Sequence, residues 1–150
     1  MKHKTDIVID ADLDTVWRMF DDQNNMTKWQ PTLKSITHKS GTPGQLDAVS
    51  ELVYEEDGRD VVMTETITAR RERSFLGGTY DSNWGSVVIF NHFEAVGDGK
   101  TRWSSNMNYS FKGVMRIMAF FMRKSICNRS DRDMNRFKLL VETTVAGKPS

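Results

Sequence analysis

The chain has 150 residues, of which 27% are charged, and its formal net charge is +1. This length fits one domain, which we place at residues 1–143 with a polar tail at 144–150, and it allows a hydrophobic core without metals or disulfides. The low net charge argues against binding of nucleic acid. The single Cys127, the lack of an apolar signal region and the lack of a long apolar run together predict a cytoplasmic protein without a transmembrane segment.

The first elements in the chain are a strand and two short helices. The run Thr5 to Asp10 is typical of a strand, and apolar side chains at three- and four-residue spacing then predict a helix that Asp12 caps. A second short helix or turn around Met26 to Trp29 has to end before Pro31, because a proline disfavours helical geometry in the residue that precedes it.

Turn signals separate β-rich runs from Leu33 onward, at residues 42–44, 57–58, 81–83 and 97–100, with a bend or bulge at 77–78. In the last run, Trp103, Ser105, Met107, Tyr109 and Phe111 alternate with polar residues, which predicts one buried face. By the same alternation Glu65 shares a face with Met63 and Ile67. Residues 84–95 are apolar on both faces, so their pattern does not identify the inward one.

A long helix over residues 113–142 closes the chain. Its apolar stripe consists of Val114, Met118, Phe121, Met122 and Ile126, continued by Met134, Phe137, Leu140 and Val141. This segment has seven basic and three acidic residues, whereas residues 1–112 have 13 basic and 17 acidic ones. The simplest interpretation is a basic helix on an acidic sheet; the alternative is a helix face that binds anionic lipid or phosphate. At about 45 Å, such a helix exceeds a small core, so its first half is expected to border a cavity or a partner.

The chain resembles the START-like, or helix-grip, superfamily (SRPBCC), which includes the birch-pollen-allergen fold and polyketide cyclase/dehydrase-like bacterial proteins. The resemblance rests on residues 7–11, on Val16-Trp17 with Phe20-Asp21, on Trp29-Gln30-Pro31, and on residues 97–102 before the last strand. It implies an α+β fold in which a curved antiparallel sheet of about seven strands is covered on its concave face by the C-terminal helix. It also implies an apolar ligand cavity and no common catalytic set.

Glu65 is the polar residue that the pattern singles out, because its strand parity places it among apolar neighbours. A buried carboxylate can orient a ligand hydroxyl, or act as an acid or base with a raised pKa. It can equally form a structural ion pair with an arginine such as Arg129, or be exposed by a strand bulge. His92 is a second, weaker candidate for proton transfer. His38 and His92 lie on separate strands without ligands at metal-binding spacing, so we expect no metal site and no cofactor.

We therefore expect a cavity that binds or carries a hydrophobic molecule, such as a lipid, sterol, quinone or polyketide. Its predicted lining is Trp29, Tyr54, Met63, Glu65, Tyr80, Trp103, Met107, Tyr109, Met118 and Met122. One alternative is a cyclase or dehydratase that uses Glu65 or His92. Another is a module that contacts a protein or a membrane peripherally through the basic, Met-rich helix. The protein is expected to be a monomer or a weak dimer.

Overall fold

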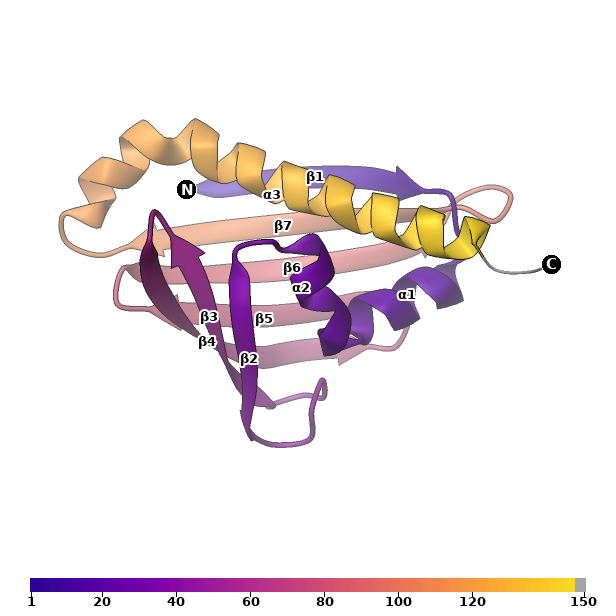
Figure 1. The fold of residues 1–150 in the computed structure, drawn as a ribbon, viewed down its shortest axis with the longest axis horizontal. Coiled ribbons are helices and arrows are strands. Elements are labelled where there is room, and N and C mark those ends of the chain that lie inside the picture. The colour runs from indigo at the N-terminus through magenta and orange to yellow at the C-terminus, as the bar shows by residue number, and fades with distance from the viewer. Residues whose placement is uncertain (148–150) are drawn as a thin grey trace.

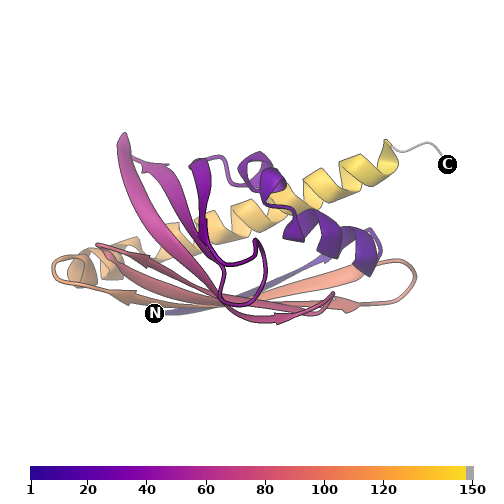
Figure 2. The same cartoon turned by 90° about the horizontal axis from the view of Figure 1, so that it is seen from below.

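A curved antiparallel sheet forms one wall of the molecule, and the helices lie on its concave side (Figures 1 and 2). The computed structural model describes residues 1–147. The strands are β1 (Lys2–Ile9), β2 (Leu33–Ser40), β3 (Val49–Glu56), β4 (Arg59–Arg71), β5 (Phe75–Ser82), β6 (Gly85–Ala95) and β7 (Thr101–Phe111). The helices are α1 (Leu13–Asp21), a 3-10 turn (Gln23–Asn25), α2 (Met26–Trp29) and α3 (Met115–Ala146). The predicted α+β helix-grip architecture is confirmed, and α3 begins and ends a few residues later than expected.

The strands follow the order β1-β7-β6-β5-β4-β3-β2, and all neighbours are antiparallel. From β2 to β7 each strand pairs with the next one in the chain, so short turns build most of the sheet. The exception is β1, which lies at one edge of the sheet and pairs with the last strand, β7. Helices α1 and α2 connect β1 to β2 at the opposite edge. In Figure 1, α3 crosses the sheet above β1 and β7, with α1 and α2 beside its C-terminal part.

A bulge in β4 creases the middle of the sheet. The pairing with β5 shifts between Ile67 and Ala69, opposite Gly77 and Gly78, where the sequence predicts a bend. A Cβ atom on Gly77 would lie 2.8 Å from Cδ1 of Phe90, which is closer than side chains approach one another. The absence of a side chain at Gly77 therefore lets the sheet curve at this point, as bulges do.

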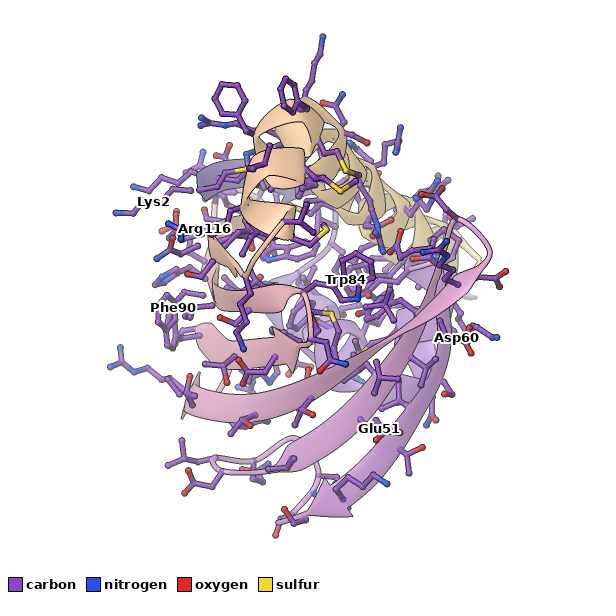
Figure 3. The ribbon with its side chains drawn as sticks, turned by 90° about the vertical axis from the view of Figure 1, so that its left-hand side faces the viewer. Lys2, Glu51, Asp60, Trp84, Phe90 and Arg116 are labelled. Atoms are coloured by element: carbon purple, nitrogen blue, oxygen red, sulfur yellow. The ribbon has the colours of Figure 1, made fainter. Side chains whose placement is uncertain are left out.

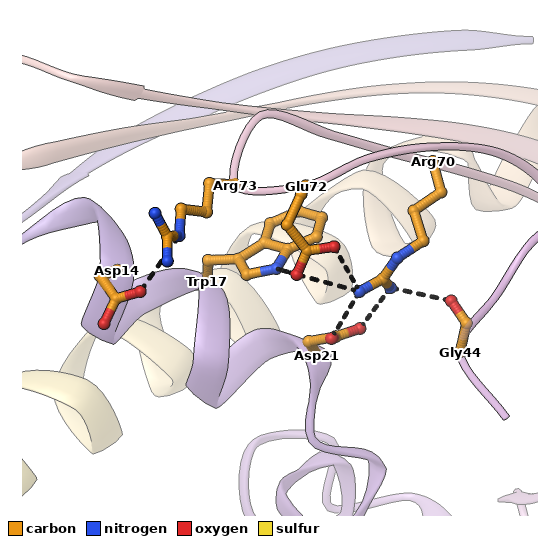
Figure 4. Close-up of polar contacts among 7 residues, drawn as sticks. All are labelled: Asp14, Trp17, Asp21, Gly44, Arg70, Glu72 and Arg73. Carbon is orange, nitrogen blue, oxygen red and sulfur yellow. Dashed lines mark hydrogen bonds and ion pairs between the residues drawn. The ribbon is translucent and has the colours of Figure 1, made fainter.

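Polar contacts fix the start of α1 and its attachment to the sheet. The carboxylate of Asp12 accepts a hydrogen bond of 2.8 Å from the backbone N–H of Thr15, which confirms the predicted cap. At the other end of α1, Arg70 of β4 donates two hydrogen bonds, of 2.6 and 2.8 Å, to the carboxylate of Asp21 (Figure 4). Arg70 also donates to the carbonyl of Gly44, so one guanidinium joins α1, β4 and the loop after β2.

The core lies under the second half of α3. Met134, Phe137 and Val141 are buried there against Trp17, Trp103 and other side chains of α1, α2 and β7. The first half of the predicted stripe behaves differently, because Val114, Met118 and Phe121 are exposed while Ala119 is buried. Only the second half of the predicted stripe therefore packs on the core.

Candidate functional site

A pocket of about 360 Å³ lies between the concave face of the sheet and α3. Its inner end is formed by the aromatic side chains of Phe20, Trp29 and Trp103, whose ring centroids lie 5.2–6.1 Å apart. Its outer end reaches Trp84, which is 41% exposed. Figure 3 looks at this outer end and shows Trp84 in the opening between the strands and the helix. The pocket is thus closed by the core at one end and opens near the start of α3.

The register of β6 and β7 supplies one wall of the pocket. Cross-strand partners project on the same side of a sheet, and the pairs Val87↔Tyr109, Ile89↔Met107 and Asn91↔Ser105 all line the pocket. Asn91 accepts a hydrogen bond of 2.9 Å from Nε1 of Trp103, so its side chain is held in place. The wall is largely apolar, with single polar groups at fixed positions.

Glu65 lies on the opposite wall, beside its cross-strand partner Tyr80. Burial raises the pKa of the Glu65 carboxyl above its ordinary value, and a hydrogen bond from the Tyr80 hydroxyl counteracts part of that rise. Burial, together with the nearby Glu65, also raises the pKa of Tyr80. These two titratable side chains therefore lie side by side on the same wall of the pocket, in contact with each other.

A second polar group borders the pocket at β3 and α3. The Tyr54 hydroxyl donates a hydrogen bond of 2.7 Å to Oε1 of Gln30, and burial raises the Tyr54 pKa. Arg129 of α3 lies over the Tyr54 ring, donates to the hydroxyl of Thr32 at 2.7 Å and pairs with Glu56. The sequence leaves open an ion pair between Arg129 and Glu65; the structure places Arg129 on Glu56 instead.

The structure brings most of the predicted lining residues together. Trp29, Tyr54, Met63, Glu65, Tyr80, Trp103, Met107 and Tyr109 all border the pocket. Met118 and Met122 do not border it, because they lie on the exposed first half of α3, where Ala119 takes the buried position.

The two candidate histidines lie away from the pocket. His92 projects from the other face of β6, with its ring 4.7 Å from that of Phe75, so it cannot reach Glu65 through the sheet. His38 is exposed on β2 and contacts the carbonyl of Gly41. Within residues 1–147, no group of three or more His, Cys, Asp or Glu side chains is arranged to hold a metal ion.

The predicted lining omits Asn91, Arg129, Ile126 and Met134, which also border the pocket. The signal for Asn91 was available, because the turn at residues 97–100 pairs β6 with β7, and the clear alternation in β7 then identifies the inward face of β6. The sequence predicts Arg129 only as a possible ion-pair partner of Glu65 and gives no direct signal that it lines a pocket, since a basic residue on a long helix is usually exposed.

Residues 2–142 match the protein family described as polyketide cyclase / dehydrase and lipid transport. No curated protein sequence matches the chain. Among solved structures, the Zhui aromatase/cyclase from Streptomyces sp. R1128 is similar at a TM-score of 0.84 and 12% identity, with 99% of each chain covered. The protein TTHA0849 from Thermus thermophilus has a TM-score of 0.80 and 12% identity over 99% of this chain and 100% of that one.

A START superfamily protein from Mycobacterium smegmatis has a TM-score of 0.70 and 12% identity, with 97% of each chain covered. At these identities the likeness concerns the fold and leaves the ligand open. None of the helices within residues 1–147 has the combined length and hydrophobicity that a membrane span requires.

Proposed function

Because the chain belongs to the polyketide cyclase/dehydrase and lipid transport family, we propose that it binds or carries a hydrophobic small molecule in the pocket under α3. The observation that carries the proposal is the pocket itself. Its volume of about 360 Å³ lies within the range of small-molecule sites, and its wall combines aromatic rings with thioethers. Lipids, sterol-like molecules, quinones and polyketides share the apolar bulk that such a wall accommodates.

The polar groups in the wall favour a ligand with one or two oxygen functions. Glu65 and Tyr80 can together donate and accept a hydrogen bond, and Tyr54 adds a hydroxyl on a neighbouring strand. A purely aliphatic ligand would leave these groups without a partner from the ligand. We therefore favour an amphipathic ligand whose hydroxyl or carbonyl lies near Glu65 while its apolar part extends toward Trp29 and Trp103.

A pair of variants on adjacent positions of β4 tests the proposal. Val61 lines the pocket, whereas Val62 points to the other face and is 48% exposed. Val61→Trp should fill part of the pocket and lower the affinity for any bound ligand by about tenfold or more, because the indole takes the ligand's volume. Val62→Trp adds the same side chain outside the pocket and should leave affinity unchanged.

The measurement is native mass spectrometry of freshly purified protein, followed by titration with a panel of fatty acids, sterols, quinones and aromatic polyketides. Saturable binding that Val61→Trp weakens and Val62→Trp preserves would support the proposal. Equal effects of the two variants, or no binding of any panel member, would contradict it.

The adjacent pair of Glu65 and Tyr80 favours a second candidate function, a cyclase or dehydratase reaction. Burial raises the pKa of the Glu65 carboxyl, and a buried carboxyl with a raised pKa can act as an acid or base. Glu65→Gln keeps the shape and removes the charge. Under the enzyme hypothesis it should lower turnover of a polyketide-like substrate by about 100-fold or more while binding survives. Under the carrier hypothesis, which we prefer, wild-type protein has no turnover to lose.

A further inference from the structure

The start of α3 exposes several large apolar side chains to solvent. Val114, Ile117, Phe120 and Phe121 are 69%, 64%, 79% and 78% exposed. The rings of Phe120 and Phe121 lie 5.5 Å apart and contact each other edge to face. Single exposed apolar residues are common on protein surfaces, but a group of this kind marks a surface that another apolar phase covers.

The same segment is strongly basic. Residues 112–124 have four basic side chains, namely Lys112, Arg116, Arg123 and Lys124, and no acidic one. Val114, Ile117 and Phe121 are spaced three and four residues apart and so share one helical face, while Arg116 and Arg123, seven apart, share another. An exposed apolar face beside a basic face is the pattern of a helix that lies at a membrane interface.

We propose that residues 112–124, the docking segment, bind the surface of a membrane that contains anionic phospholipid. Such a surface offers hydrocarbon for the phenylalanine rings and phosphate groups for the cations. A second copy of the chain fits less well, because two docking segments placed face to face would bring their basic residues together without any acidic residue of the segment between them.

The docking segment lies next to the open end of the pocket. The backbone N–H of Lys112 donates a hydrogen bond of 3.0 Å to the carbonyl of Trp84, and the pocket is lined by Trp84 and by Phe111, the residue before Lys112. In Figure 3 the opening that contains Trp84 faces the viewer below the start of α3. A protein docked in this way would present its pocket to the bilayer and could exchange an amphipathic ligand with it. This last step rests on the proposed function, whereas docking itself does not.

The test is co-sedimentation of the full chain with vesicles of phosphatidylcholine, alone or mixed with phosphatidylglycerol. Wild-type protein should bind the mixed vesicles and should be released by high salt, because the attraction of its cations is screened. Phe120→Ser combined with Phe121→Ser should weaken binding by about tenfold or more, since two large apolar groups no longer insert. Arg116→Gln combined with Arg123→Gln should weaken it and reduce its salt dependence.

Two matched controls come from the same chain. Leu139→Ser changes an apolar residue that is 67% exposed on the second half of α3, and it should leave vesicle binding unchanged. Lys39→Gln with Arg132→Gln removes the same charge as the arginine pair from exposed positions outside the docking segment. The proposal would be overturned if the wild-type protein bound neither kind of vesicle, or bound both kinds with equal affinity.

Controls that weaken binding as much as the docking-segment variants would also overturn it. So would a dimer in sedimentation velocity that the Phe120/Phe121 variant abolishes, because a second copy would then cover the surface. Vesicle binding that persists in Val61→Trp, with no ligand found for the wild-type pocket, would uphold docking while rejecting the proposed function.

Discussion

The two halves of α3 share one continuous helical backbone but have opposite surroundings. In the second half, Phe137 is 0% exposed and touches the aromatic core, while in the first half Phe121 is 78% exposed. In Figure 2 the short helices α1 and α2 lie beside the C-terminal half of α3, and not beside its N-terminal half. The same residue type therefore contributes to stability in one half and is available for binding in the other, which composition and periodicity alone do not distinguish.

The largest expected effect comes from the buried half. Phe137→Ala should lower the free energy of unfolding by about 3–5 kcal/mol, because it removes a buried ring and leaves a cavity among Trp29, Trp103 and Phe20. Chemical denaturation measures the loss. A loss below about 1 kcal/mol would mean that the second half of α3 is not docked on the core.

The contact between Arg70 and Asp21 should be the next most costly to remove, because the Arg70 side chain is 8% exposed. Arg70→Leu should destabilise the fold by about 2–3 kcal/mol, since it leaves the Asp21 carboxylate and the Gly44 carbonyl without their donor. Arg73→Leu is the matched control, since Arg73 pairs with Asp14 at an exposed site and should cost less than about 1 kcal/mol. Equal losses in thermal or chemical unfolding would contradict this assignment.

The pH dependence of stability should reveal the buried carboxyl. Because burial raises the folded-state pKa of Glu65, the folded protein holds that proton to higher pH than the unfolded chain does. The carboxyl therefore destabilises the fold progressively as pH rises from the ordinary Glu value, about 4.3, through the folded-state pKa. Glu65→Gln removes this effect, so its stability relative to wild type should increase over that range and then level off. A difference that is independent of pH would show that Glu65 is well solvated.

The smallest effect is expected at the exposed half of the helix. Phe121→Ser should change the free energy of unfolding by less than about 0.5 kcal/mol, because the ring contacts solvent in the folded state. Paired with Phe137→Ala, this variant measures directly how much the two halves of α3 differ. A loss of several kcal/mol would show that Phe121 packs on the protein in solution.

Local patterns in the sequence predict much of the fold because they are determined by short-range physics. The Asp12 cap, the turns at residues 57–58 and 97–100, and the alternation from Trp103 to Phe111 each depend on neighbouring residues in the chain. The inward orientation of Glu65 follows from the same alternation.

The remaining features depend on how distant elements pack. The apolar spacing of Val114, Met118 and Phe121 indicates a helical face, but whether a sheet lies beneath that face depends on where β7 ends and how far α3 extends beyond it. Likewise, the partner of Arg129 depends on the position of Glu56 across the pocket, which no short pattern encodes.

The crease at Gly77 and Gly78 has a consequence for how the pocket could diverge among related chains. Neither glycine lines the pocket, yet the curvature that they permit, together with the bulge opposite, helps to set the distance between the strands and α3. A side chain at Gly77 would contact Phe90 on the other face of the sheet, and would alter the volume available to a ligand without adding an atom to the pocket. A side chain at Gly78 would instead project beside Ile67 and Ile89 into the pocket. The curvature of the backbone can therefore change which ligands the pocket accepts, so two chains with identical lining side chains need not bind the same molecule.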